Sequence, residues 1–203
     1  QMVFNPMLWS TVLPLSPRRT PYTLELMTTV AMFGALLVQR VKLAFDKRRP
    51  NELSPRVQPM IATPGFSAYP SGHATESRLV SELLLNLLDK RMQGEWKDQV
   101  KTMLIALSDR VAENRVVAGV HFPVDSKGGQ DLAVAVVALL KRRADGEQPP
   151  PADALPDSFV DLWQRAQGEW ELPAEPAQAV GKAAKAPKAA KAVKTTVRRQ
   201  TAP

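Results

Sequence analysis

The chain has no cysteine among its 203 residues, and it has few aromatic side chains. Without cysteine it can form neither a disulfide framework nor a thiolate metal site, and its compartment stays open. Phe, Trp and Tyr make up only 6% of the sequence, whereas Ala, Leu, Val and Lys are plentiful, so the composition favours helices. Histidine is also scarce: His73 and His121 are the only two. Chemistry that needs an imidazole must use one of these positions.

Positive charge is concentrated at the C-terminal end. The net charge is +7, and residues 172–203 account for +6 of it, because seven basic residues there accompany a single acid, Glu175. In this tail lysine recurs among Ala and Pro without any aromatic residue, so burial cannot offset the entropy of ordering and disorder is predicted. The tail would act either as a solubilising extension or as a weak, nonspecific binder of nucleic acid or acidic surfaces.

Apolar residues recur at helical spacing over several segments, which predicts an all-α chain. These segments are 23–46, 73–91, 96–114, 125–143 and, shorter than the others, 157–170. We expect a helical bundle over residues 1–143, a Pro-rich linker with a short amphipathic helix over 144–171, and the disordered basic tail over 172–203.

The longest apolar run, Leu26 to Val38, lies in the first of these segments. Thr28 and Thr29 interrupt it, and polar residues flank it closely. It is shorter than a typical membrane span, so a buried core helix is predicted. We therefore expect no integral membrane span, and a soluble chain that is either cytoplasmic or exported.

Two cations, Lys42 and Arg49, lie near the predicted end of the first helix and are followed by Pro50. Seven positions separate them, nearly two helical turns, so both are expected on one helix face, with Pro50 ending the helix. Such cations often only satisfy terminal carbonyls. The next segment, residues 50–71, holds five prolines and is expected to be a long irregular loop of the kind that is usually functional.

A second cluster reads Pro70, Ser71, Gly72, His73. The small pair Ser71 and Gly72 allows backbone amides to approach a ligand closely. His73 begins a predicted helix, whose N-terminus offers free N–H groups and a positive dipole end. The cluster therefore suits an oxyanion, although a capped helix start with an incidental histidine is the plainer alternative.

A third cluster comprises Asn114, Arg115, His121 and Asp125. Gly119 permits a turn between two predicted helices, and Asp125, four residues after His121, can orient the imidazole through one ring nitrogen. Each residue also has an ordinary structural explanation. The coincidence of three such clusters, which together use both histidines, favours one site for a phosphate-like oxyanion.

The three clusters resemble the signature of a superfamily that comprises type 2 phosphatidic acid phosphatases, bacterial acid phosphatases and vanadium-dependent haloperoxidases. That signature is Lys-x6-Arg-Pro, Pro-Ser-Gly-His and Ser-Arg-x5-His-x3-Asp. Only Asn114 departs from it, where the family usually has serine. The resemblance spans about residues 42–140 and implies an all-α bundle of the acid phosphatase/vanadium haloperoxidase type. Known haloperoxidases are considerably longer, which leaves open a larger bundle, or a homo-oligomer whose second copy completes the core.

The resemblance also implies a role for each residue. Lys42, Arg49 and Arg115 would neutralise the oxyanion, and the Ser71 hydroxyl and the Gly72 amide would complete its cradle. His73 would be the acid–base residue and Asp125 would orient His121. His121 would be the phosphoryl-accepting nucleophile of a phosphatase, or the ligand of vanadate, the cofactor of a haloperoxidase that oxidises halide with hydrogen peroxide; a phosphatase of this kind would need no cofactor.

The branch of the superfamily depends on residues 64–75. This stretch is more similar to haloperoxidases than to lipid phosphatases, because Phe66 stands seven residues before His73, as in fungal chloroperoxidases. Phe66 is therefore assigned to a halide or substrate pocket, and a vanadium-dependent haloperoxidase is the favoured reading. The alternatives are a soluble acid phosphatase that hydrolyses a phosphate ester at the same site, and a non-catalytic binding protein that acts through its basic tail.

Overall fold

The computed structural model describes residues 5–89, 92–146 and 156–170, and this part of the chain is helical without strands, which confirms the all-α prediction. The elements are a 3-10 helix, η1 (Pro6–Thr11), and six α-helices: α1 (Pro21–Phe45), α2 (Pro50–Leu53), α3 (Gly72–Leu88), α4 (Gly94–Val117), α5 (Pro123–Ala144) and α6 (Asp157–Gly168). The basic tail, residues 172–203, lies outside the described residues, so its predicted disorder and binding stay predictions.

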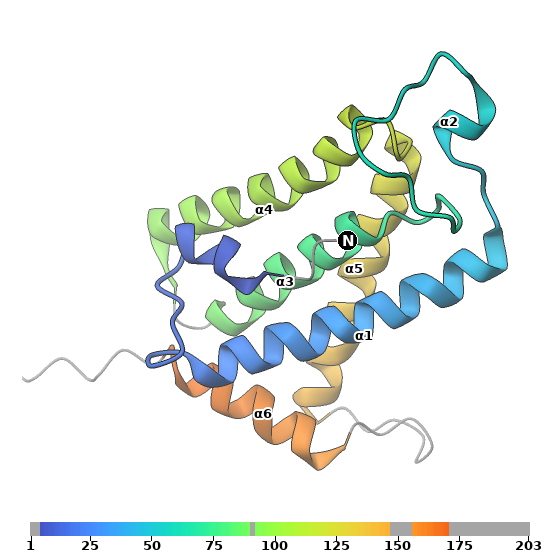
Figure 1. Ribbon diagram of the computed structural model, residues 1–203. Coiled ribbons are helices and arrows are strands. Elements are labelled where there is room, and N and C mark those ends of the chain that lie inside the picture. Colours follow the sequence, from blue (N-terminus) through green and yellow to red (C-terminus); the bar gives the residue numbers. More distant parts are fainter. Residues whose placement is uncertain (1–4, 90–91, 147–155, 171–203) are drawn as a thin grey trace, which may run out of the picture. The chain divides into compact units, whose positions relative to one another are not determined.

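Helix α3 is the centre of the fold and packs against α5, α4 and α1 (Figure 1). Its leucines recur at helical spacing and point inward: Leu79, Leu83, Leu84, Leu87 and Leu88 are all buried. They form one core with apolar residues of α1, α4, α5 and α6. A helix with this much apolar surface is stable only when its neighbours cover it, so α3 fixes the positions of the others.

Close contacts at two glycines bring α3 near to α5 and to α1. A Cβ atom on Gly129 of α5 would lie 2.7 Å from the Ser71 carbonyl oxygen, and one on Gly34 of α1 would lie 2.2 Å from Leu79 Cδ1. Glycine leaves this room because it has no side chain. The start of α3 therefore lies directly against the first turns of α5.

Helix α6 packs against α1 and completes its N-terminal end. The carboxylate of Glu169, just after α6, accepts hydrogen bonds from the backbone N–H groups of Tyr22 and Thr23 and from the Thr23 hydroxyl. Free N–H groups of a first helical turn need such acceptors, because no residue of the helix itself can supply them. A residue distant in sequence thus caps α1.

Lys42 and Arg49 do not share one helix face, contrary to the sequence-based expectation. Helix α1 ends at Phe45, because Asp46 takes a left-handed conformation with φ 40°. Arg49 lies beyond that break and is the N-cap residue of α2. Pro50 was expected to end the first helix, but it is the first residue of α2. Proline suits a first helical position because its missing N–H would have no helical partner there.

Helix α1 buries only one of its faces. Met32, Phe33, Leu36 and Leu43 point outward, with Met32 66% and Leu36 68% exposed. The helix has 25 residues, which corresponds to a length of about 37 Å at 1.5 Å per residue. Its length and apolar composition are those of a membrane-crossing helix, and it is the one helix of the described residues that meets both criteria.

Candidate active site

A cavity of about 830 Å³ lies where the C-terminal half of α1, the start of α3, the end of α4 and the loop after α2 meet. Five ionisable residues of the predicted site line it: Lys42, Arg49, His73, Arg115 and His121. Gly72 and Phe66 line it as well. The structure thus brings the three sequence clusters together around one cavity.

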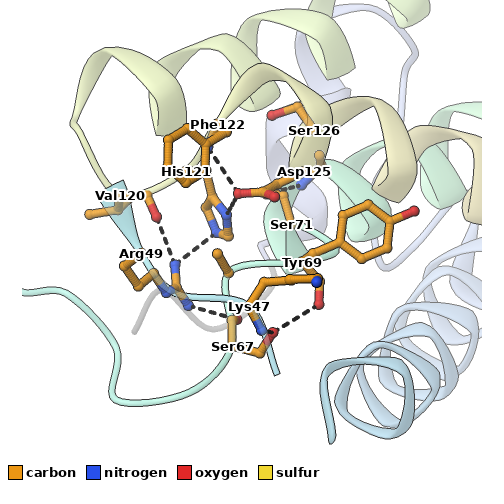
Figure 2. A network of polar contacts seen from close by, with 12 residues as sticks. Lys47, Arg49, Ser67, Tyr69, Ser71, Val120, His121, Phe122, Asp125 and Ser126 are labelled. Atoms are coloured by element: carbon orange, nitrogen blue, oxygen red, sulfur yellow. Dashed lines mark hydrogen bonds and ion pairs between the residues drawn. The ribbon is translucent and has the colours of Figure 1, made fainter. Parts of the chain in front are cut away.

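His121 is held between a carboxylate and a guanidinium (Figure 2). Its Nδ1 lies 3.2 Å from Asp125 Oδ2, and its Nε2 lies 3.1 Å from Arg49 Nη1. A guanidinium can only donate, so Nε2 carries the lone pair and Nδ1 carries the proton that faces Asp125. This tautomer leaves Nε2 as the nitrogen that can bond to an electrophile.

Asp125 is itself fixed by two elements. Its Oδ2 also accepts the backbone N–H of Phe122 at 2.9 Å, and its carbonyl oxygen accepts the Ser71 N–H at 2.9 Å. The first bond anchors the carboxylate at the start of α5, and the second ties α5 to the start of α3. The His121 ring is therefore oriented by a carboxylate that the helix packing holds in place.

The electrostatic surroundings keep His121 neutral. Burial lowers its pKa, and the positive charges of Arg49 and Lys42 lower it further, while the hydrogen bond and charge of Asp125 act in the opposite direction. Burial dominates because a charged imidazole loses its hydration there. A lowered pKa favours the neutral ring, in which Nε2 is unprotonated, as a nucleophile or a ligand must be.

Lys42 and Arg49 both donate to backbone carbonyls of the loop before α3. Lys42 Nζ donates to Ser67 O at 2.7 Å and to Ala68 O at 3.1 Å. Arg49 donates from Nε to Phe66 O at 3.0 Å and from Nη1 to Val120 O at 2.9 Å. These bonds position two nearly fully buried cations at the cavity wall.

Phe66 packs against the same two cations. Its ring centroid lies 5.3 Å from Lys42 Nζ and 5.4 Å from Arg49 Cζ, distances at which a cation is attracted to an aromatic face. Phe66 therefore helps to hold the cations as well as lining the cavity. This role suits any oxyanion and does not itself favour halide chemistry.

Arg115, in the last turn of α4, has an unsatisfied donor. Its Nε is buried and has no hydrogen-bond partner among the described residues. Burial also lowers the pKa of Arg115 below its usual value. A buried donor without a partner is costly, so an acceptor in the cavity, such as an oxyanion oxygen, would stabilise this side chain.

His73 lies in the cavity wall at the start of α3. Burial lowers its pKa to about 4, and Arg115, His121 and Arg49 add to the effect. A dianionic ligand beside it would counteract these positive charges and raise the pKa again. The imidazole is therefore suited to gain a proton when an anion binds.

Three residues of the predicted clusters lie outside the cavity wall: Ser71, Asn114 and Asp125. Ser71 is fully buried as the N-cap of α3, and its hydroxyl accepts the Ala74 N–H at 3.5 Å. Asn114 is exposed on α4, away from the lining. Asn114, which stands where the resembled signature usually has serine, is therefore not part of the cavity wall.

Glu76 lines the cavity but was not among the site residues predicted from the sequence. It stands four positions after Gly72 on α3, a spacing that puts both on one helix face. That spacing was a usable signal. The burial of its carboxyl, which raises its pKa to about 7, is a property of the fold and could not be read from the residues.

Comparison with known proteins gives a family and a fold. The sequence profile of the PAP2 superfamily matches residues 23–147, which include all three clusters. Among solved structures, the fold is similar to the crystal structure of a transmembrane PAP2-type phosphatidylglycerolphosphate phosphatase from Bacillus subtilis. The TM-score is 0.52 at 21% identity, and the match covers 72% of this chain and 81% of that one. No curated protein matches the sequence.

The expectation of a soluble chain without an integral membrane span is wrong. It is overturned by the likeness of the fold to that of a transmembrane protein, together with the length and apolar outer face of α1. The polar residues that flank Leu26–Val38 led to the error. The helix continues past them to Phe45, with further apolar residues such as Leu43 on its outer face.

Proposed function

This chain belongs to the PAP2 superfamily, and we propose that it hydrolyses the phosphomonoester of a membrane lipid. The observation that carries the proposal is that the cavity is lined by charged residues and by an apolar stretch of α1. Its lining combines three cations and both histidines with an apolar stretch of α1: Ala31, Met32, Ala35 and Val38. Ala31 and Lys42 stand at opposite ends of this lining, about 16 Å apart along the helix at 1.5 Å per residue. A lipid phosphate has the same division between a charged headgroup and an apolar chain.

In the first step, His121 Nε2 attacks phosphorus. The N–P bond forms as the P–O bond to the alcohol breaks, and His73 gives its proton to the departing alkoxide oxygen. Lys42, Arg49 and Arg115 stabilise the charge that spreads over the phosphoryl oxygens. Asp125 stabilises the positive imidazole ring through Nδ1.

In the second step, water hydrolyses the phosphohistidine. His73, now neutral, takes a proton from the attacking water, an O–P bond forms, and the N–P bond breaks. Inorganic phosphate leaves, and Nε2 regains its lone pair. Nucleophile and acid–base residue thus return to their starting protonation states.

The apolar end of the cavity supports a lipid rather than a soluble ester. Met32 lines the cavity and is also largely exposed on the outer face of α1, beside Leu36. An alkyl chain could therefore pass from the cavity to a bilayer without crossing polar surface. Phosphatidylglycerolphosphate, for which the structurally similar phosphatase is named, belongs to this chemical class.

A vanadium-dependent haloperoxidase remains the second candidate. Vanadate would fit the same cations, with His121 as its ligand, and when bound it would supply the activation of peroxide for halide oxidation. The preference for this branch came from Phe66, whose contacts with Lys42 and Arg49 serve phosphate equally well. The phosphatase is therefore the better-supported function.

A paired assay on the full chain in detergent micelles tests the choice. One arm contains a long-chain lipid phosphate, with release of inorganic phosphate as the readout. The other contains orthovanadate, hydrogen peroxide, bromide and a halogen-accepting dye. We expect phosphate release that vanadate inhibits. Vanadate-dependent bromination without phosphate release would instead establish the haloperoxidase.

A further inference from the structure

Glu76 places a carboxyl in the wall of the cavity that binds the proposed substrate. A Cβ atom on Gly72 would lie 3.7 Å from Glu76 Oε1 and 3.7 Å from Val38 Cγ1. The carboxyl group therefore lies near the meeting point of the first turn of α3 and the inner face of α1.

The position of Glu76 along the cavity follows from the packing of α1 on α3. Gly72 lies near Val38, and Leu79 contacts Gly34, so α1 runs back toward its N-terminus as α3 runs forward. One turn of α3 beyond Gly72 is about 5 Å toward the apolar wall. The Glu76 backbone thus lies one turn nearer that wall, while its carboxyl reaches back to Gly72, beside the residues proposed to bind the phosphoryl group.

The Glu76 carboxyl has no hydrogen bond or ion pair with the described residues. Glu82 on the same helix differs, since it forms an ion pair with Arg78 at 2.8 Å. Glu76 shares the cavity with polar and ionisable side chains of several elements: Gln39, Lys42, Arg49, Thr63, His73, Arg115 and His121. Burial alone raises the pKa of Glu76, to about 7, so these cations do not compensate its charge.

A half-buried carboxyl without a partner is unfavourable, and a ligand that supplies a donor would offset that cost. We propose that Glu76 selects substrates that carry a hydrogen-bond donor close to the phosphoryl group, an ammonium in preference to a hydroxyl. The inference rests on the proposed function and names its substrate class: a long-chain phosphomonoester with an amino or hydroxyl group on the carbon next to the ester carbon. An ammonium is preferred because its bond to a carboxylate is charge-assisted.

Binding of phosphonates, which cannot be hydrolysed, tests this selection without relying on turnover. A long-chain alkylphosphonate and its 2-amino analogue are titrated into the full chain in detergent micelles at pH 8, above the pKa of Glu76. We expect the wild type to bind the amino analogue roughly tenfold more tightly or better. Glu76→Gln should bind both equally, while Glu82→Gln, the matched control outside the cavity, should keep the preference.

Equal binding of both phosphonates by the wild type would overturn the selection, as would a preference that survives in Glu76→Gln. Hydrolysis of the matching phosphate esters is measured in parallel. A Glu76-dependent binding preference without any hydrolysis would overturn the proposed phosphatase activity but support the selecting role of Glu76. Hydrolysis with no binding preference would do the reverse.

Discussion

Arg49 Nη1 lies 3.1 Å from His121 Nε2, on the side of the ring opposite Asp125. The same Nη1 also donates to the Val120 carbonyl at 2.9 Å. In the proposed mechanism, Arg49 therefore contacts the nitrogen that bonds to phosphorus and stands where a phosphoryl oxygen would arrive. During attack its donor can move from the ring nitrogen to that oxygen, which keeps the charge stabilised along the reaction.

Arg49→Lys should lower kcat/KM by about 10²-fold, because an ammonium cannot reproduce the planar fork that reaches Phe66, Val120 and His121 together. Steady-state hydrolysis of a lipid phosphate measures the loss. Arg48→Lys is the matched control, since Arg48 is exposed and should lose little. A rate for Arg49→Lys within threefold of the wild type would contradict the role assigned to the fork.

Asp125→Asn should reduce kcat on the order of 10³-fold with little change in folding. The amide would keep the shape of the carboxyl, but it would no longer favour the His121 tautomer with the proton on Nδ1, nor stabilise the positive ring. Turnover is compared with the thermal unfolding midpoint of the same preparation. Equal losses in both would mean that Asp125 acts mainly through stability, through its bond to Phe122.

The pH dependence should differ between kcat/KM and kcat. The pKa of His73 is lowered to about 4, so above that pH the free enzyme loses the proton that the leaving group needs, and kcat/KM should fall. A bound phosphoryl dianion raises this pKa, so kcat should persist to higher pH.

His73→Ala should lower kcat by about 10²–10⁴-fold and remove the alkaline decline of kcat. An unchanged profile in that variant would exclude His73 as the proton donor.

Gly129→Ala should lower the free energy of unfolding by about 1–3 kcal/mol. The added Cβ would lie 2.7 Å from the Ser71 carbonyl and 2.8 Å from Thr75 Oγ1, so α5 must shift from α3. Thermal unfolding in micelles measures the change. Gly168→Ala in α6, where a Cβ meets nothing within 4 Å, is the control and should not destabilise. Comparable midpoints for both variants would argue against close backbone packing at Gly129.

The helices could be predicted because their signals are local. The leucines of α3 recur at helical spacing, and Pro123 with Gly119 marks the start of α5 after a turn, where φ of Gly119 is +73°. The position of Arg49 could not be predicted in the same way. The end of α1 depends on Asp46 adopting a left-handed conformation, which its sequence neighbours do not specify.

The exposure of the apolar outer side of α1 could not be predicted from the sequence either. The run from Leu26 to Val38 has the same composition whether protein or lipid covers it, and only the fold reveals that Met32 and Leu36 face outward. The unpartnered carboxyl of Glu76 is a comparable case, since partners are a property of packing. Residues with a fixed motif, such as His121 and Asp125, were assignable because their spacing alone brings them together.

The most direct test of the account is to detect the phosphoryl group on His121. Full-length enzyme turning over a lipid phosphate is denatured at alkaline pH, where phosphohistidine survives, and the modified peptide is located by mass spectrometry. The account predicts an acid-labile phosphoryl group on His121 that is absent from His121→Ala. Hydrolysis that proceeds without this modification, or a phosphoryl group found on His73 instead, would contradict it.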